Sequence, residues 1–196
     1  FINSLLFLLL VFCVGCKSNN NLIESFPGYR TIGRFSKRLN EKTGIVLSCY
    51  GTTIHPSKEH LQRYGKQMFR VTYYVPKNQQ DVISLEEARC LLVSIVESFL
   101  EEINTDPELR KILDVYPVTY DWIEVNIHFK DRNKVDIGSG GISNLYFWSE
   151  KIRYETYKIS KYTGKYPAEG RHTIVKEESY KDALEIVKQQ GCLQQF

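Results

Sequence analysis

The stretch from Ile83 to Asn104 limits the fold more than any other part of this sequence. Ser84 and Glu87 have the spacing of a capping box, in which each side chain binds the backbone N–H of the other residue at the start of a helix. A helix of about 20 residues is about 30 Å long, so this one can support a whole sheet. Behind the cap, apolar residues recur at the three- and four-residue steps of a one-sided helix: Leu85, Ala88, Leu92, Ile95, Val96, Phe99 and Ile103.

Other segments alternate apolar and polar residues with the period of a strand that has one wet face. The clearest are 67–75 and 122–130, and further strands are expected at 45–53, 145–148 and 151–159. Shorter helical segments are expected at 29–44, 107–113 and 179–191. This order predicts the α+β class: an antiparallel sheet of about five strands, with the long central helix and two shorter helices packed on one face.

The N-terminal segment reads as a targeting signal. Its apolar run of about ten residues is too short for a membrane span, which needs about 20, but suits the apolar region of a signal peptide. The run ends at Cys13-Val-Gly-Cys16, which resembles the bacterial lipobox. Cys16 matches the residue that is lipidated and becomes the new N-terminus, and Gly15 matches the small residue before it. Cys13 stands where the pattern usually has Leu.

This resemblance implies a bacterial lipoprotein with three parts. Residues 1–15 form a signal peptide whose start is expected to be missing, 16–27 a lipidated tether, and 28–196 a single α+β domain. Lys17 is not the Asp that usually marks retention in an inner membrane, so the resemblance favours an outer membrane, facing the periplasm or the cell surface. The alternative is a plain signal peptide that is cut elsewhere.

Three segments of the mature chain resemble small uncharacterised lipoproteins of obligately intracellular bacteria. They are residues 84–89 (SLEEAR), residues 104–110 (NTDPELR) with the Tyr116-Pro117 that follows, and residues 179–187 (SYKDALEIV). The resemblance implies no activity, because that group has no assigned function.

Four basic residues gather on the polar side of the 29–44 helix, close to the expected anchor. Each cation near an anionic membrane surface adds about 1 kcal/mol of attraction, so these residues are candidate membrane-facing groups. The alternative is an ordinary solvated face. The four are Arg30, Arg34, Lys37 and Arg38.

A second basic region lies between Lys151 and Lys176, with seven Lys and Arg residues against two Glu. Tyrosines are interleaved, and each offers an apolar face with a polar tip. This pattern suits an anionic envelope polymer or an acidic protein, and the alternative is a solvated hairpin. Nucleic acid also fits the pattern physically but is not expected as the partner of an exported protein. The candidate binding residues are Lys158, Lys161, Lys165, Tyr157, Tyr162 and Tyr166.

The mature chain contains none of the common catalytic or nucleotide-binding motifs. The sequence therefore favours a non-catalytic binding or structural module, without cofactor or metal. His55 and His60 lack the neighbours of a zinc site. The alternative is a small envelope hydrolase or transferase with its site around Glu124, His128 and Asp131.

The remaining cysteines are three in number once Cys13 is removed and Cys16 is lipidated. They are Cys49, Cys90 and Cys192, and the expectation is three reduced thiols that serve as small apolar residues. At most one disulfide is possible within the chain.

Overall fold

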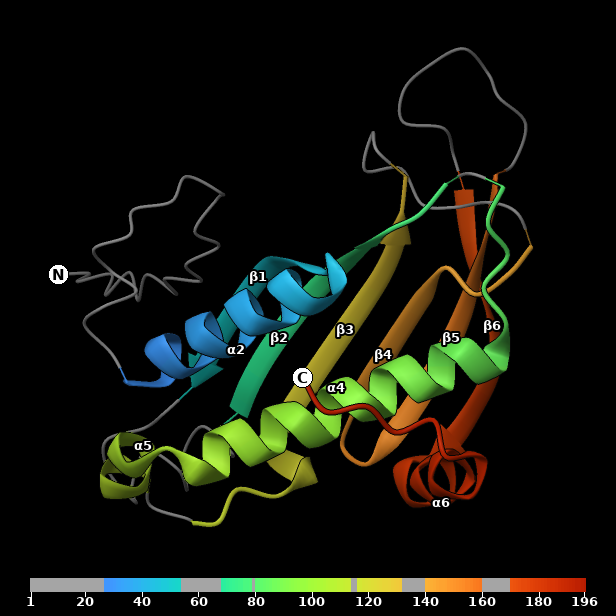
Figure 1. Ribbon diagram of the computed structural model, residues 1–196. Coiled ribbons are helices and arrows are strands. Elements are labelled where there is room, and N and C mark those ends of the chain that lie inside the picture. The colour runs from blue at the N-terminus through green and yellow to red at the C-terminus, as the bar shows by residue number, and fades with distance from the viewer. Residues whose placement is uncertain (1–26, 54–67, 79, 114–115, 132–139, 160–169) are drawn as a thin grey trace, which may run out of the picture.

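The computed structural model describes residues 27–53, 68–78, 80–113, 116–131, 140–159 and 170–196. These residues form an α+β fold with a six-stranded sheet and four α-helices, one long and three shorter (Figure 1). The elements are α2 (Pro27–Thr43), β1 (Val46–Thr53), β2 (Met68–Pro76), α4 (Leu85–Thr105), α5 (Pro107–Ile112), β3 (Ile123–Lys130), β4 (Asn144–Trp148), β5 (Lys151–Ile159), β6 (Gly170–Ser179) and α6 (Tyr180–Gln190).

The sheet is mixed, so the expectation of an antiparallel sheet of about five strands is wrong in both respects. The strands lie side by side in chain order, β1 to β6. Every neighbouring pair is antiparallel except β2 and β3, which run parallel. The cause is α4. This crossover helix carries the chain back to the end of the sheet at which β2 begins, so β3 runs in the same direction as β2.

The sixth strand, β6, was not expected from the sequence. Its residues do not alternate between apolar and polar, because it is an edge strand and its two apolar residues are neighbours. Ile174 and Val175 stand at an irregularity in the β5–β6 pairing and are both more than half exposed. A bulge at an edge strand hides the period of two on which a prediction from sequence depends.

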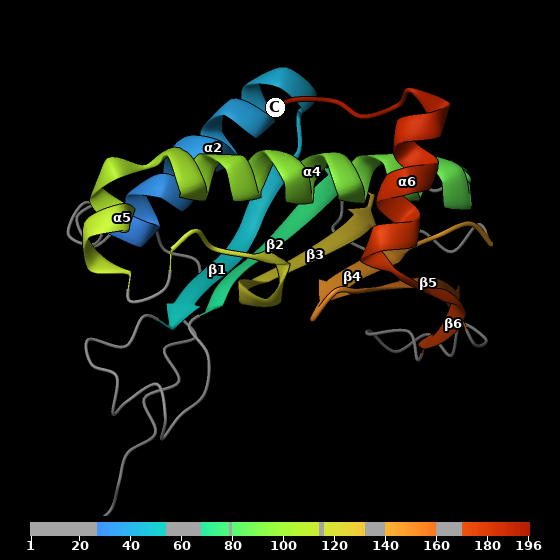
Figure 2. The same ribbon diagram turned by 90° about the horizontal axis from the view of Figure 1, so that it is seen from below.

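The helix α4 forms as its sequence indicates. Ser84 Oγ accepts the Glu87 backbone N–H at 3.1 Å, and Glu87 Oε2 accepts the Ser84 backbone N–H at 2.9 Å. Its apolar side packs on the sheet, with Leu92, Ile95 and Phe99 fully buried. Together, α2, α4 and α6 lie on one face of the sheet (Figures 1 and 2).

The opposite face of the sheet, here called the open face, is not covered by any helix of the described chain (Figure 2). Along β3, buried residues of the core alternate with half-buried ones, and register extends this alternation across the neighbouring strands. The side chains of the open face include Arg70, Thr72, Tyr74, Glu124, Asn126, His128, Asn144, Tyr146, Trp148, Arg153, Glu155, Tyr157, His172 and Glu177.

No helix among the described residues has the length and apolar character that crossing a membrane requires.

Candidate functional site

The strongest grouping of chemically active side chains lies across the middle of the open face. In register, Tyr74 of β2 is opposite His128 of β3, His128 is opposite Asn144 of β4, and Asn144 is opposite Glu155 of β5. Tyr157 of β5 is likewise opposite His172 of β6. Neighbouring strands are about 4.8 Å apart, so these side chains form a continuous row across the sheet.

Asn144 joins the two histidines of this row. Its Oδ1 is 2.6 Å from His128 Nδ1, and its Nδ2 is 2.7 Å from His172 Nδ1. Asn144 is fully buried, whereas the His172 side chain is 40% exposed. The amide therefore lies beneath the two rings and holds both of them from below.

Glu155 adds a carboxylate at one end of the row. It is buried, and its Oε2 lies 3.6 Å from His172 Nδ1. The backbone beneath it is fixed, because the Glu155 carbonyl accepts both the N–H of Ser143 at 2.8 Å and the hydroxyl of Ser143 at 3.2 Å. The Glu155 carboxylate thus lies beside the His172 ring.

Aromatic rings surround this polar chain. The His128 ring is 6.1 Å from that of Tyr74 and 5.9 Å from that of Tyr146, and both pairs meet edge to face. The Tyr157 ring lies 4.9 Å from His172. We call Tyr74, His128, Asn144, Tyr146, Tyr157 and His172 the open-face row. Rings with a polar tip suit ligands that have both apolar and hydrogen-bonding parts.

The arginines of the open face are neutralised by carboxylates on the next strand. Arg70 Nε is 2.7 Å from Glu124 Oε2, and Arg153 Nε is 2.8 Å from Glu177 Oε1. The hydrogen bond to Glu177 raises the pKa of Arg153 above its usual value. Lys130 lies over the Tyr74 ring, with its Nζ 4.9 Å from the centroid. The charges of both arginines are therefore balanced within the face itself.

Glu124 and His128, two of the residues proposed for catalysis, have separate partners. Glu124 binds Arg70 and also accepts a hydrogen bond from Asn126 at 3.0 Å, while His128 is held by Asn144. Glu124 and His128 are four residues apart on one strand, which separates them by about 13 Å. Asp131 follows the end of β3. The structure instead groups His128 with residues of β4 and β6, which only the strand register brings together.

The predicted basic binding surface is divided. Tyr157 lies in the open-face row, and Lys158 is exposed at the next position of β5, on the other side of the sheet. Lys161, Tyr162, Lys165 and Tyr166 lie outside the described residues, as do Cys16, His55 and His60. Binding by the basic residues therefore stays a prediction.

Three of these four basic residues of α2 pair with acidic residues of α4, of α5 and of the junction between them, which the sequence did not indicate. Arg30 is 2.5 Å from Glu108, Arg34 is 2.6 Å from Asp106, and Arg38 is 2.7 Å from Glu102. Lys37 lies 3.9 Å from Glu41 on its own helix. A membrane-facing role for these four residues stays a prediction. Their ion pairs weaken the argument for it, because each positive charge already has an acidic partner within the protein.

Asp106 is the centre of this helix junction. Its Oδ1 accepts the backbone N–H groups of Glu108 and Leu109 and so caps α5, while its Oδ2 accepts from Thr31 at 2.5 Å and from Arg34. Burial acts to raise the pKa of Asp106, but these hydrogen bonds outweigh burial and lower it. The acidic residues opposite α2 therefore serve the fold.

The expectation of three reduced thiols is wrong. Cys90 of α4 and Cys192 form a disulfide, with their Cα atoms 5.9 Å apart, and Cys49 is a free, exposed thiol. The cause is the turn at Gly191, whose positive φ ends α6 and directs the chain back over α4. Residues 192–196, here called the strap, then run along α4. Ser94 Oγ accepts the Gln194 N–H at 2.9 Å, and Ser98 Oγ accepts the Phe196 N–H at 3.1 Å.

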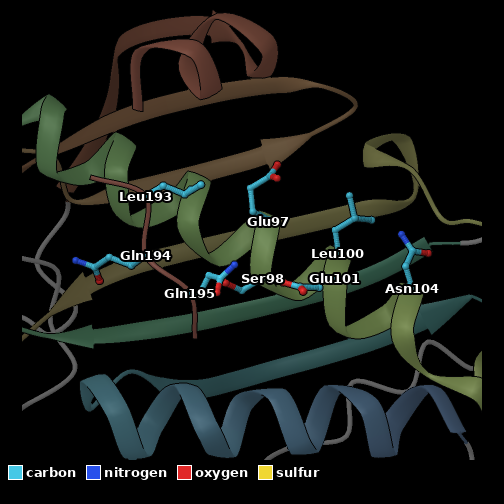
Figure 3. Close-up of a pocket in the computed structure, with 8 residues that line it drawn as sticks. All are labelled: Glu97, Ser98, Leu100, Glu101, Asn104, Leu193, Gln194 and Gln195. Carbon is cyan, nitrogen blue, oxygen red and sulfur yellow. The ribbon is translucent and has the colours of Figure 1, made fainter. Parts of the chain in front are cut away.

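A shallow groove of about 320 Å³ lies between α4 and the strap (Figure 3). This volume is at the lower limit for ligand sites. Several of its polar groups already hold the fold together. Glu97 accepts hydrogen bonds from the hydroxyls of Tyr120 and Tyr180, and the Asn104 amide pairs with the backbone of Val118. The groove is therefore a structural junction and a weaker candidate than the open face.

The described residues contain no group of three or more His, Cys, Asp or Glu side chains that could hold a metal ion. Comparison of the chain with protein-family models, with curated proteins and with solved structures found no match.

Proposed function

We propose that this protein is a membrane-anchored envelope lipoprotein whose mature domain is a non-catalytic binding module, and that the open face is its binding surface. The observation that carries the second part is the open-face row. Helices cover one side of the sheet, while the other side presents aromatic rings and imidazoles around a fixed amide. The proposed partner is an envelope polymer such as a polysaccharide, with an acidic protein as the alternative.

The disulfide supports the envelope location. Disulfides form and persist in oxidising compartments such as the bacterial periplasm and are rare in the cytosol. Cys90 and Cys192 are joined in this structure, and they are far apart in the sequence. An exported protein is the natural setting for such a bond, in agreement with the lipobox-like Cys13-Val-Gly-Cys16.

The anchor is tested by the mass of the native protein. We expect a chain that begins at Cys16 and carries diacylglycerol, with Cys16→Ala leaving an uncleaved and unlipidated precursor. A native N-terminus at any other residue would contradict the lipoprotein assignment.

Binding is favoured over catalysis because Glu124 and His128 of the predicted catalytic site are not joined. Glu124, the carboxylate predicted to act with His128, is bound to Arg70 and stands about 13 Å along the strand from His128. A carboxylate orients an imidazole for general-base work only within hydrogen-bond distance of its ring. An enzyme centred on Glu124, His128 and Asp131 is therefore the less favoured proposal.

The binding surface is tested by removing two of its rings. The double change Tyr146→Ala and Tyr157→Ala is expected to reduce capture of envelope polymer by at least tenfold, because each ring offers a rigid contact face. Capture is measured by co-sedimentation of the full chain with purified envelope material. Both tyrosines are half-buried on the side away from the helices, so we expect the helix layer to remain folded.

A matched pair of controls separates this face from the helix side. Lys181→Glu changes an exposed residue of α6, and the triple change of Lys158, Lys161 and Lys165 to Glu tests the predicted basic surface. Lys181→Glu should leave capture unchanged. Full capture by the tyrosine variant, with loss only in the lysine variant, would place the binding site on the basic segment instead.

A further inference from the structure

Asn144 lies between two imidazole rings and controls which nitrogen of each ring carries a proton. A primary amide has an oxygen that only accepts hydrogen bonds and a nitrogen that only donates them. Asn144 Oδ1 faces His128 Nδ1 at 2.6 Å, and Asn144 Nδ2 faces His172 Nδ1 at 2.7 Å. The first contact needs a proton on its imidazole nitrogen, and the second needs a lone pair.

One histidine donates through Nδ1 and the other accepts in either orientation of the Asn144 amide. If Oδ1 and Nδ2 of Asn144 change places, the two histidines exchange roles, but one ring still donates through Nδ1 and the other still accepts. In a neutral imidazole, a proton on one nitrogen leaves a lone pair on the other. When both rings are neutral, the two Nε2 atoms therefore differ, one being an acceptor and the other a donor.

Because the Asn144 amide is buried, it needs both histidines as hydrogen-bond partners. Asn144 is fully buried within the central strand β4, and a buried polar group left without a partner is costly. The neighbouring Ser143 is also fully buried and tied to β5 through the Glu155 carbonyl. The amide therefore satisfies both rings from a fixed position in the sheet.

We propose that the open face takes a neutral, hydroxyl-rich ligand of the carbohydrate class, and that Asn144 is a positioning residue that sets His128 and His172 in opposite tautomers for it. The inference rests on the proposed function, because it specifies the ligand of the same face. A hydroxyl group both donates and accepts, so a sugar matches one donor beside one acceptor. An anion would instead be matched by two donors.

The rings and charges of the face agree with this ligand. Tyr74 and Tyr146 stand on either side of His128 and offer apolar faces to the C–H groups of a sugar ring. Arg70 and Arg153 are each neutralised by a carboxylate. Affinity for a neutral glycan should accordingly change little with salt, because screening acts on charged partners.

The test combines a tautomer measurement with binding to two probes. Long-range ¹H–¹⁵N spectra of the full chain at neutral pH should show one imidazole protonated on Nδ1 and the other on Nε2. A neutral N-acetylglucosamine tetramer should bind in preference to dextran sulfate. Asn144→Asp gives both rings an acceptor, so both should become protonated on Nδ1 and tetramer affinity should fall at least tenfold.

Two further variants keep the test independent of folding. His172→Ala alters an exposed side chain and should also reduce tetramer affinity at least tenfold, without a change in the circular dichroism spectrum. Gln189→Glu introduces the same charge at an exposed position of α6, on the helix side of the sheet, and should alter affinity by less than about twofold.

The outcomes distinguish this inference from the proposed function. Salt-sensitive binding of dextran sulfate alone, weakened by Tyr146→Ala, would keep the open face as the binding surface and overturn the carbohydrate assignment. Identical tautomers in the unmodified protein, or full tetramer affinity in Asn144→Asp, would overturn the role of Asn144. If no open-face variant altered binding of either probe, both proposals would fail.

Discussion

Glu178→Ala is expected to lower the free energy of unfolding by about 3–5 kcal/mol, the usual cost of removing one partner from a buried ion pair. Arg89 and Glu178 side chains are 8% and 7% exposed and join α4 to β6. Arg89 donates two hydrogen bonds to Glu178, at 2.7 and 3.0 Å, and Tyr154 donates a third at 2.5 Å. Without the carboxylate, a buried guanidinium and a buried phenol lose their partner.

The neighbouring Glu177 supplies the control. It pairs with Arg153 at 2.8 Å, but both side chains are at least half exposed. Glu177→Ala should therefore change stability by at most about 1 kcal/mol, as exposed ion pairs do. Urea unfolding followed by circular dichroism measures both variants. Equal losses in Glu177→Ala and Glu178→Ala would contradict the buried pair.

The same carboxylate should make the protein sensitive to acid. Burial acts to raise the pKa of Glu178, but the hydrogen bonds from Arg89, Lys176 and Tyr154 outweigh burial and lower it to about 2, from an ordinary 4.5. A group with a lowered folded pKa stabilises the fold fully above its unfolded pKa. The contribution should be complete above about pH 4.5 and lost as the pH falls toward 2, a slope that Glu178→Gln removes.

Removing the disulfide should have the second large effect. Cys90 and Cys192 are separated by 102 positions, and cross-linking a loop of that length stabilises a protein by about 4.7 kcal/mol if the effect is loop-closure entropy alone. The double change of both residues to Ala is therefore expected to lower the free energy of unfolding by about 2–5 kcal/mol. The strap would keep its hydrogen bonds with Ser94, Ser98 and Lys42 and the packing of Phe196 against the core.

Cys49→Ala is the matched control, because this thiol is free and exposed. It should leave stability within about 0.5 kcal/mol of the unmodified protein. Thiol labelling in denaturant without reductant provides a direct count, with two of these three cysteines blocked. Three reactive thiols in protein taken from the envelope would contradict the bond.

Local features of the fold were predictable from the sequence. The capping box at Ser84 and Glu87 and the apolar stripe behind it place α4 correctly, because both depend only on neighbouring residues. Alternation likewise finds β2 and β3. These signals arise within a single turn or strand, where sequence distance and spatial distance agree.

Features that depend on how elements meet were not predictable. The parallel pairing of β2 with β3 follows from the return path of α4, and the disulfide follows from a turn at Gly191. The candidate site depends most strongly on register. His128, Asn144 and His172 belong to three strands, and nothing in their spacing along the chain indicates that one amide joins them.

The central claim is that the open face meets the partner. It is tested most directly by photo-crosslinking in intact cells, with p-benzoylphenylalanine placed at Tyr146 of the open face or, as a control, at Ile112 of α5. Ile112 is 39% exposed and belongs to α5, which packs against α2 and α4. We predict that the probe at Tyr146 forms adducts with an envelope component while the probe at Ile112 forms none. Adducts from Ile112 alone would show that the helix side makes the contact and would contradict the proposal.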